Sequence, residues 1–234
     1  SITIPEGVAS IGKGAFSKCE ELTEISIPTS VSYIGAEAFQ LCYKLTDVTI
    51  PEGVTTIEPK TFFNCNSLKR VSIPDSVTTI SDNAFSVCPS LTDITIPESI
   101  TKIGQGAFGG CKWLKEITIP EGVTALYDYT FSGCERLSTL SLPNTLTSIG
   151  CRTFYSCRVL KEVTIPQSVS TIGDSAFAHC QWLEAVHCKS TTPPTISDNT
   201  FSECAEGLTI YVPKGCGQNY KSAEGWSSYQ EAIV

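Results

Sequence analysis

The sequence predicts a mostly β solenoid in which the chain winds as a right-handed coil and successive turns stack on one another. The first observation is a proline that recurs every 23 residues, at positions 5, 28, 51, 74, 97, 120, 143 and 166. The second is a phenylalanine on the same step, at positions 16, 39, 62, 85, 108, 131, 154 and 177. The third is a cysteine three residues after each phenylalanine, at positions 19, 42, 65, 88, 111, 134, 157 and 180. A fixed period of this size is the signature of a repeat architecture.

The main strand of each unit is predicted from the segment before the proline, as residues 45–51 show. Val48 and Ile50 are apolar and alternate with polar neighbours, which is the period of a half-buried strand. Valine, isoleucine and threonine fill this segment, and β-branched side chains favour strands. Pro51 then ends the strand because proline has no N–H to donate to a neighbouring strand.

The rest of the unit is predicted to close the turn and to fill its interior. Val54 and Ile57 form a second apolar pair, which indicates a short second strand on the opposite side of the coil. Phe62 and Cys65 are expected to point inward. One unit cannot bury its own apolar face, so the units must stack, with roughly 4.8 Å between neighbouring strands. Roughly nine turns would then give a parallel, concave main sheet on the order of 45 Å long.

The twelve cysteines raise the question of disulfides or zinc. Eight of them occupy the same slot of successive units, and Cys204 continues the series after a one-residue slip. A repeated slot favours buried thiols, because a free cysteine packs as a small hydrophobic residue. Cys151, Cys188 and Cys216 lie off the pattern. We expect Cys188 to point inward and Cys151 to be exposed, and leave open whether these three form disulfides.

The units also carry a resemblance to a known family. The segments LTEISIPTSVSYIGAEAFQLC (22–42) and LTDITIPESITKIGQGAFGGC (91–111) resemble the repeats of BspA-like leucine-rich repeat surface proteins. The resemblance covers residues 1–188 and recurs in eight units. It implies an α/β-type leucine-rich repeat solenoid, mostly β, displayed outside the cell or on the surface of a bacterium or protist. It also implies a role in adhesion and host contact, without naming a ligand.

The chain is expected to divide at the point where the pattern loosens. Residues 1–188 would form the array of about eight 23-residue units, which begins in the middle of a unit. Residues 189–234 would form a final irregular repeat and a C-terminal cap. The cap is needed because the last turn of a solenoid exposes an unpaired sheet edge. The residues expected to cover that end are Tyr220, Trp226, Tyr229 and Ile233.

Composition and charge exclude several classes of function. The net charge is −8, and the 16 basic residues are scattered singly along the sequence, which argues against a nucleic acid partner. No apolar run approaches the roughly 18 residues that span a bilayer, so no membrane insertion is expected in this segment. His187 lies in an outward slot near Cys188 and Glu184, but a lone histidine in a polar column is usually an ordinary surface residue. The other histidine, His179, adds no catalytic pattern, so we predict no catalytic residues and no enzyme activity. We predict no cofactor and no metal site either.

The outward positions of the main strands supply the first set of candidate ligand-binding residues. One column of outward positions is charged, with Glu24, Asp47, Arg70, Asp93, Glu116 and Glu162. The next column is lined by serine and threonine hydroxyls. Such polar columns also suit an ordinary solvated sheet, so both interpretations remain open. Arg70 is expected to relieve the repulsion between the stacked acids.

The loops around the cysteines supply the second set. Trp113, Trp182, Tyr43 and Tyr155 are aromatic residues at slots that are expected to face solvent. Exposed aromatic rings are candidate anchors for a protein or a sugar ring. With the resemblance, which implies the cell surface and host adhesion, these features favour a non-enzymatic cell-surface or extracellular interaction module that adheres to a host protein or glycan. The alternative hypothesis is a passive structural spacer within a larger surface protein.

Overall fold

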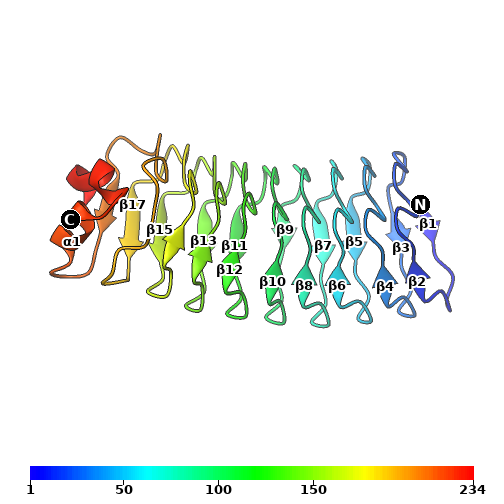
Figure 1. The fold of residues 1–234 in the computed structure, drawn as a ribbon. Coiled ribbons are helices and arrows are strands. Elements are labelled where there is room, and N and C mark those ends of the chain that lie inside the picture. The colour runs from blue at the N-terminus through cyan, green and yellow to red at the C-terminus, as the bar shows by residue number, and fades with distance from the viewer.

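The structure, a computed structural model, describes residues 1–234 and is a mostly β parallel solenoid of about nine turns. Two rows of strands run along its length (Figure 1). The main row contains β1 (Ile2–Thr3), β3 (Ile25–Ser26), β5 (Asp47–Thr49), β7 (Arg70–Ser72), β9 (Asp93–Ile94), β11 (Glu116–Thr118), β13 (Thr139–Ser141), β15 (Glu162–Ile165), β17 (Ala185–Cys188) and β18 (Thr209–Tyr211). The second row contains β2 (Ser10–Ile11), β4 (Tyr33–Ile34), β6 (Thr56–Ile57), β8 (Thr79–Ile80), β10 (Lys102–Ile103), β12 (Ala125–Leu126), β14 (Ser148–Ile149) and β16 (Thr171–Ile172).

Every strand pair is parallel, and the array keeps a constant register of 23 residues, as in the pairing of Val48 with Val71. Equivalent slots of successive units therefore lie directly beside one another. The loops are tied together in the same way: of 124 backbone–backbone hydrogen bonds, only 21 lie within helices and strands. The N–H of Phe62, for example, donates to the carbonyl oxygen of Ala84 at 2.8 Å. Stacking thus satisfies the backbone of the turns as well as that of the strands.

The phenylalanines form a single file through the interior, as the sequence predicts. Phe39, Phe62 and Phe85 are completely buried, and their ring centroids lie 5.4 and 5.3 Å apart. The file runs from Phe16 to Phe201 with nearly parallel rings. Leucine, isoleucine and valine side chains complete one continuous core of 59 buried residues. The predicted inward columns are therefore confirmed.

The repeated cysteines line a second interior column. Cys42, Cys65, Cys88, Cys111, Cys134, Cys157 and Cys180 are completely buried. Each thiol donates to the carbonyl oxygen of the phenylalanine 26 residues earlier, as Cys65 does to Phe39 at 3.1 Å. All twelve cysteines are free thiols. Cys188 is buried as expected, whereas the expectation that Cys151 is exposed is wrong. Cys151 is half-buried between neighbouring turns: its N–H donates to Asp128 Oδ1 of the preceding turn at 2.7 Å, and Gly173 of the next turn packs against its backbone.

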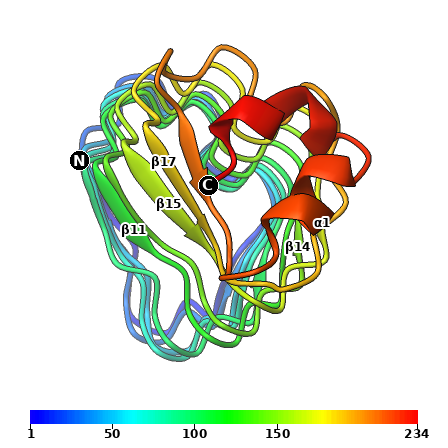
Figure 2. The same cartoon turned by 90° about the vertical axis from the view of Figure 1, so that its left-hand side faces the viewer.

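The C-terminal end of the stack is covered by α1 (Gly217–Ser222) and the 3-10 helix η1 (Trp226–Ala232). Viewed along the solenoid axis, the two helices lie across the end of the coil (Figure 2). Trp226 and Tyr220 are completely buried, and Trp226 Nε1 donates to the carbonyl oxygen of Pro194 at 2.7 Å. Ile233 pairs with Ile210 of β18. The predicted cap is therefore present.

Candidate functional site

A groove lies on the outer face of the main sheet, over β3, β5, β7 and β9, and we call it the sheet groove. Its volume is about 890 Å³. It contains four of the predicted site residues, namely Glu24, Asp47, Arg70 and Asp93. Hydroxyl groups lie beside them, from Ser26, Thr49, Ser72 and Thr95. Strand alternation explains this lining, because the intervening side chains at Val48 and Val71 point into the core.

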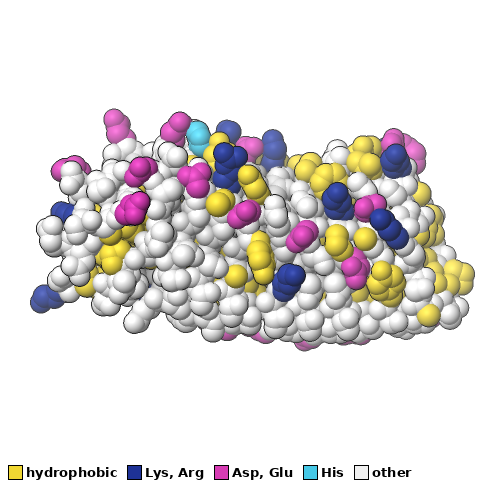
Figure 3. Space-filling model, in the orientation of Figure 1, with side chains coloured by type: hydrophobic (Ala, Val, Ile, Leu, Met, Phe, Trp, Pro, Cys, Tyr) yellow, Lys and Arg dark blue, Asp and Glu magenta, His cyan; other side chains and the backbone are white.

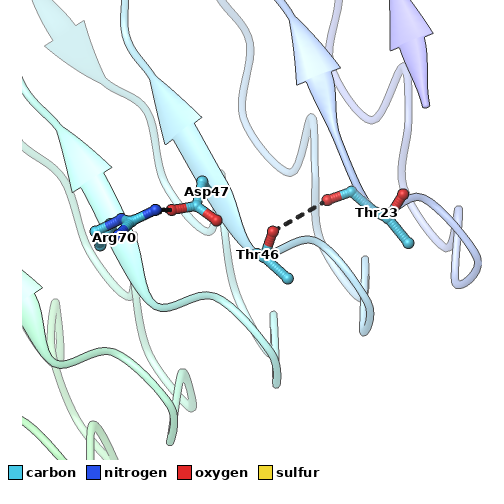
Figure 4. A network of polar contacts seen from close by, with 4 residues as sticks. All are labelled: Thr23, Thr46, Asp47 and Arg70. Atoms are coloured by element: carbon cyan, nitrogen blue, oxygen red, sulfur yellow. Dashed lines mark hydrogen bonds and ion pairs between the residues drawn. The ribbon is translucent and has the colours of Figure 1, made fainter.

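The charged column of the sheet groove is held in place by the strand register. Asp47 pairs with Arg70, and Arg70 pairs with Asp93, on neighbouring strands. Arg70 Nε donates to Asp47 Oδ1 at 2.6 Å, and Figure 4 shows the two side chains meeting across β5 and β7. Arg70 therefore relieves the repulsion between the stacked acids. Both side chains remain open to solvent, so a partner could reach them.

The ionised form of Asp47 is favoured by its neighbours. Hydrogen bonding with the adjacent Thr46 hydroxyl, followed by the Arg70 guanidinium, lowers the pKa of Asp47 below its ordinary value. The Thr46 hydroxyl also lies 3.4 Å from the carbonyl oxygen of Thr23, a long contact that Figure 4 displays. Asp47 thus stays negatively charged at neutral pH and keeps its ion pair with Arg70.

The remaining two acids of the predicted column lie beyond the sheet groove. Glu116 is on β11 and Glu162 is on β15, both exposed on the same face of the main sheet. At the C-terminal end of this face, His187 stacks on Tyr211 with ring centroids 4.8 Å apart. Sequence reasoning missed Tyr211 because it lies in the irregular last unit, where the 23-residue register no longer applies.

Two of the predicted aromatic anchors lie in what we call the pre-strand rim, the loops that run from each cysteine to the next main strand. Trp113 precedes β11 and is 49% exposed, and Trp182 precedes β17 and is 54% exposed. The Arg136 guanidinium lies over the Trp113 ring at 5.0 Å, and Lys161 Nζ lies over the Trp182 ring at 5.8 Å. These two cations were not identified from the sequence, although both are visible there as basic residues within the rim.

The other two predicted aromatic residues are less accessible than expected. Tyr43 and Tyr155 are both half-buried. Tyr43 belongs to the N-terminal part of the pre-strand rim. Tyr155 lies before the cysteine of its unit, where His179 packs edge-on against its ring at 4.9 Å. Tyr155 therefore lies outside the pre-strand rim that contains the two tryptophans.

The histidines form no catalytic pair with the neighbouring groups. His187 is next to Cys188 in sequence, but strand alternation directs Cys188 into the core, and burial raises the pKa of its thiol to about 12. His179 Nδ1 lies 3.0 Å from Glu203 Oε2 at the surface. No group of three histidine, cysteine or acidic side chains is arranged to hold a metal ion. The interactions seen on this surface are hydrogen bonds, ion pairs and ring stacking.

Figure 3 shows one long face of the molecule, where exposed hydrophobic side chains lie among separate acidic and basic ones. Exposed large hydrophobic residues outside the main sheet and the pre-strand rim include Tyr33, Val87, Tyr127 and Tyr129. Lys102 Nζ lies over the Tyr127 ring at 6.0 Å. Cation–aromatic pairs therefore occur on other surfaces of the solenoid too. No helix of the structure has the length and apolar character needed to cross a bilayer.

The repeats match a described protein family. Residues 1–114 and 78–209 match the BspA type leucine rich repeat region, in six copies. Together these two overlapping segments extend from the first unit to the last main strand. The comparison with curated proteins found no match.

Three solved bacterial structures show the same architecture. A leucine-rich repeat protein from Bacteroides ovatus is 28% identical, with a TM-score of 0.71, over 100% of this chain and 73% of that one. A leucine-rich repeat protein of T. pallidum is 31% identical, with a TM-score of 0.62, over 78% of this chain and 77% of that one. A leucine rich cell surface protein from Faecalibacterium prausnitzii is 29% identical, with a TM-score of 0.51, over 95% of this chain and 74% of that one.

Proposed function

Because the chain belongs to the BspA-type leucine-rich repeat family, we propose that it is a non-enzymatic interaction module that works at the cell surface or outside the cell. Its partner is a host or other extracellular protein, or a glycan, and its role is adhesion. The surface location is supported by the F. prausnitzii relative, which is described as a cell surface protein. The partner docks on the outer face of the main sheet.

The single observation that carries this proposal is the sheet groove. It combines Glu24, Asp47, Arg70 and Asp93 with a column of hydroxyl groups on a rigid sheet. A rigid face loses little conformational entropy when a partner binds, which favours affinity. The acids exceed the one base in this groove, so the partner surface is expected to carry complementary positive charge or hydroxyl groups.

The test is a binding screen of the unmodified protein against mucins, matrix proteins and a glycan panel. For any partner found, the double variant Glu24→Arg/Asp93→Arg should weaken binding by at least about tenfold. The cause would be charge repulsion with a basic partner, or loss of the carboxylate acceptors with a hydroxylated one. Both residues are exposed and form no ion pair, so the reversal leaves the core intact. Surface plasmon resonance at two salt concentrations measures the effect.

The matched control reverses two acids away from the groove, Glu224→Arg/Glu231→Arg, in the exposed part of the cap. This control should bind as the unmodified protein does. Equal loss in both variants would show that only net charge matters and would remove the groove from the proposal.

The second candidate function is a passive spacer within a larger surface protein. The observation that favours it is the continuity of the core, which forms one cluster from Ile4 to Ile233 and makes the solenoid a stiff rod. No binding to any member of the screen would favour the spacer over the interaction module.

A further inference from the structure

Basic side chains gather in the C-terminal half of the pre-strand rim, although they are scattered in the sequence. Four loops make up this half, which we call the cationic rim: residues 112–115, 135–138, 158–161 and 181–184. The cations of the cationic rim are Lys112, Lys115, Arg136, Arg158 and Lys161, all of them exposed. Only one other basic residue, Arg152, lies between positions 112 and 188. The fold therefore concentrates positive charge on one edge of an acidic protein.

The equivalent loops of the first units show that this is not a general property of the repeat. Residues 20–23, 43–46, 66–69 and 89–92 contain two acids and two bases in all, Glu20, Glu21, Lys44 and Lys69. They also contain no tryptophan. The slot thus tolerates neutral or acidic residues, and the core does not require cations or tryptophans there.

The cationic rim is a rigid platform. Its loops are joined by backbone hydrogen bonds, from Arg136 N to Lys112 O at 3.0 Å and from Trp182 N to Arg158 O at 3.1 Å. Trp113 and Trp182 stand three turns apart, or about 16 Å at the 5.4 Å spacing of the phenylalanine rings. A cation lies over one ring face of each tryptophan, and about half of each side chain remains exposed.

Acidic side chains lie between the basic side chains of the cationic rim, so the positive charges are separated from one another. Glu135 Oε1 lies 3.2 Å from Lys112 Nζ, and Glu135 Oε2 lies 4.0 Å from Arg158 Nη1. The other acids nearby are Glu116, Glu162 and Glu184. A dense row of phosphates, as in nucleic acids, would meet these carboxylates at close range. A polymer with separated negative charges would not.

We propose that the cationic rim binds an acidic polysaccharide whose sulfate or carboxylate groups are separated by neutral sugar rings. Arg136, Lys161 and their neighbours pair with the anionic groups. The exposed faces of Trp113 and Trp182 pack against the apolar faces of sugar rings. This inference rests on the proposed function as an interaction module and names the ligand class of a surface other than the sheet groove.

The test uses a size-defined chondroitin sulfate oligosaccharide as the probe, measured by isothermal titration calorimetry at physiological ionic strength. The unmodified protein should bind it, and more weakly as salt is raised. The variant Arg136→Glu/Lys161→Glu should lose about tenfold or more in affinity. The variant Trp113→Ala/Trp182→Ala should also lose affinity, while its salt dependence stays unchanged because no charge is removed.

The matched control is Lys102→Glu/Tyr127→Ala, which removes a cation–aromatic pair from the second row of strands. It should bind the probe as the unmodified protein does. Unsulfated chondroitin separates the two sources of charge: binding retained without sulfate assigns the contact to carboxylates, and binding lost assigns it to sulfates.

Three results would overturn the inference. They are no binding of the probe, equal loss of binding in the Lys102→Glu/Tyr127→Ala control, and equally tight binding of single-stranded oligothymidylate. The last would show non-specific attraction to any polyanion. The Glu24→Arg/Asp93→Arg groove variant should still bind the oligosaccharide. Because the two surfaces are separate, loss of oligosaccharide binding in the rim variants would not affect the groove proposal, and a partner bound in the groove would not affect this inference.

Discussion

At the scale of single residues, the buried cysteines act as neutral packing groups with a directed S–H. Cys134 is completely buried, and its thiol donates to the carbonyl oxygen of Phe108 at 3.4 Å. Burial disfavours the thiolate, so it raises the pKa of Cys134 to about 12 and that of Cys88 well above its ordinary value. Such thiols are poor nucleophiles because the reactive species is the thiolate.

This predicts a loss of stability at alkaline pH. In the unfolded chain each thiol releases its proton near its ordinary pKa of 9.0, while the folded chain keeps it. Above that pH the folded state binds more protons, so the free energy of unfolding falls as pH rises. Each buried thiol should contribute up to about 1.4 kcal/mol per pH unit. Urea unfolding from about pH 8 to about pH 11, below the raised pKa of about 12 that burial gives Cys134, measures this slope.

The control is Cys134→Ala, which removes one titrating thiol and should make the alkaline slope less steep. A slope unchanged by this substitution would contradict the assignment to buried thiols. A thiol reagent gives a second test on the unmodified protein at about pH 8. The completely buried cysteines should not react, whereas the half-buried Cys151 and Cys216 should react.

Predictions for single residues were correct where the position in the repeat decides whether a side chain points into the core or toward solvent. The phenylalanine file and the exposure of Trp113 follow from the slot alone. The partial burial of Tyr43 and the placement of Arg136 over Trp113 do not. These depend on side-chain rotamers and on contacts between neighbouring turns, and the period of a repeat carries no information about either.

At the scale of elements, the tight turn before each cysteine requires an unusual backbone. The residue that precedes the cysteine has positive φ in every unit, for example Leu41 at 62°, Val87 at 58° and Gly110 at 77°. Glycine adopts this conformation without strain, whereas a β-branched residue does not. The sequence pattern did not reveal this slot because leucine, valine and lysine occupy it in other units.

Val87→Gly should therefore stabilise the protein, although Val87 lies in an ordinary repeat. Glycine removes the strain of positive φ in the folded state, and this effect should outweigh the extra conformational entropy that glycine gives the unfolded chain. The free energy of unfolding should therefore rise by about 1 kcal/mol. Val87 is 41% exposed, so little packing is lost. The free energy of unfolding in urea measures the change.

Gly110→Val places the same strain in the same slot one turn later and should destabilise by about 1 kcal/mol or more. Space is not the obstacle, since a Cβ at position 110 would lie 3.5 Å from Val87 Cα, an ordinary contact. Destabilisation by both variants would show that the valine side chain packs productively and that the turn is not strained.

The sequence also predicted the positions of the strands and their order along the chain. The proline marks the end of each main strand. The second strands are only two residues long, as in Thr56–Ile57. Hydrogen bonds between the loops carry the rest of the stacking, which a pattern of alternating residues cannot disclose.

At the scale of the whole molecule, stability is expected to be a sum over turns and the contacts between them. The cap covers the C-terminal end of the stack. There Trp226 packs near Phe201, with ring centroids 6.1 Å apart, and edge-on against Tyr220 at 4.9 Å. We propose that residues 189–234, the irregular repeat with its cap, form a unit distinct from the array of residues 1–188.

Trp226→Ala tests this division. The substitution removes a completely buried side chain and its hydrogen bond to Pro194, so it should cost about 3–5 kcal/mol. In a solenoid the loss should be local: amide hydrogen exchange should speed up in residues 189–234 and stay slow in β5, β7 and β9. Trp182→Ala, which removes an equally large but 54% exposed side chain, should leave both regions protected. If Trp226→Ala instead reduces protection uniformly along the chain, the array and its C-terminal end unfold as one cooperative unit. The free energy of stacking between turns would then be too large for the end to unfold separately when the cap is weakened.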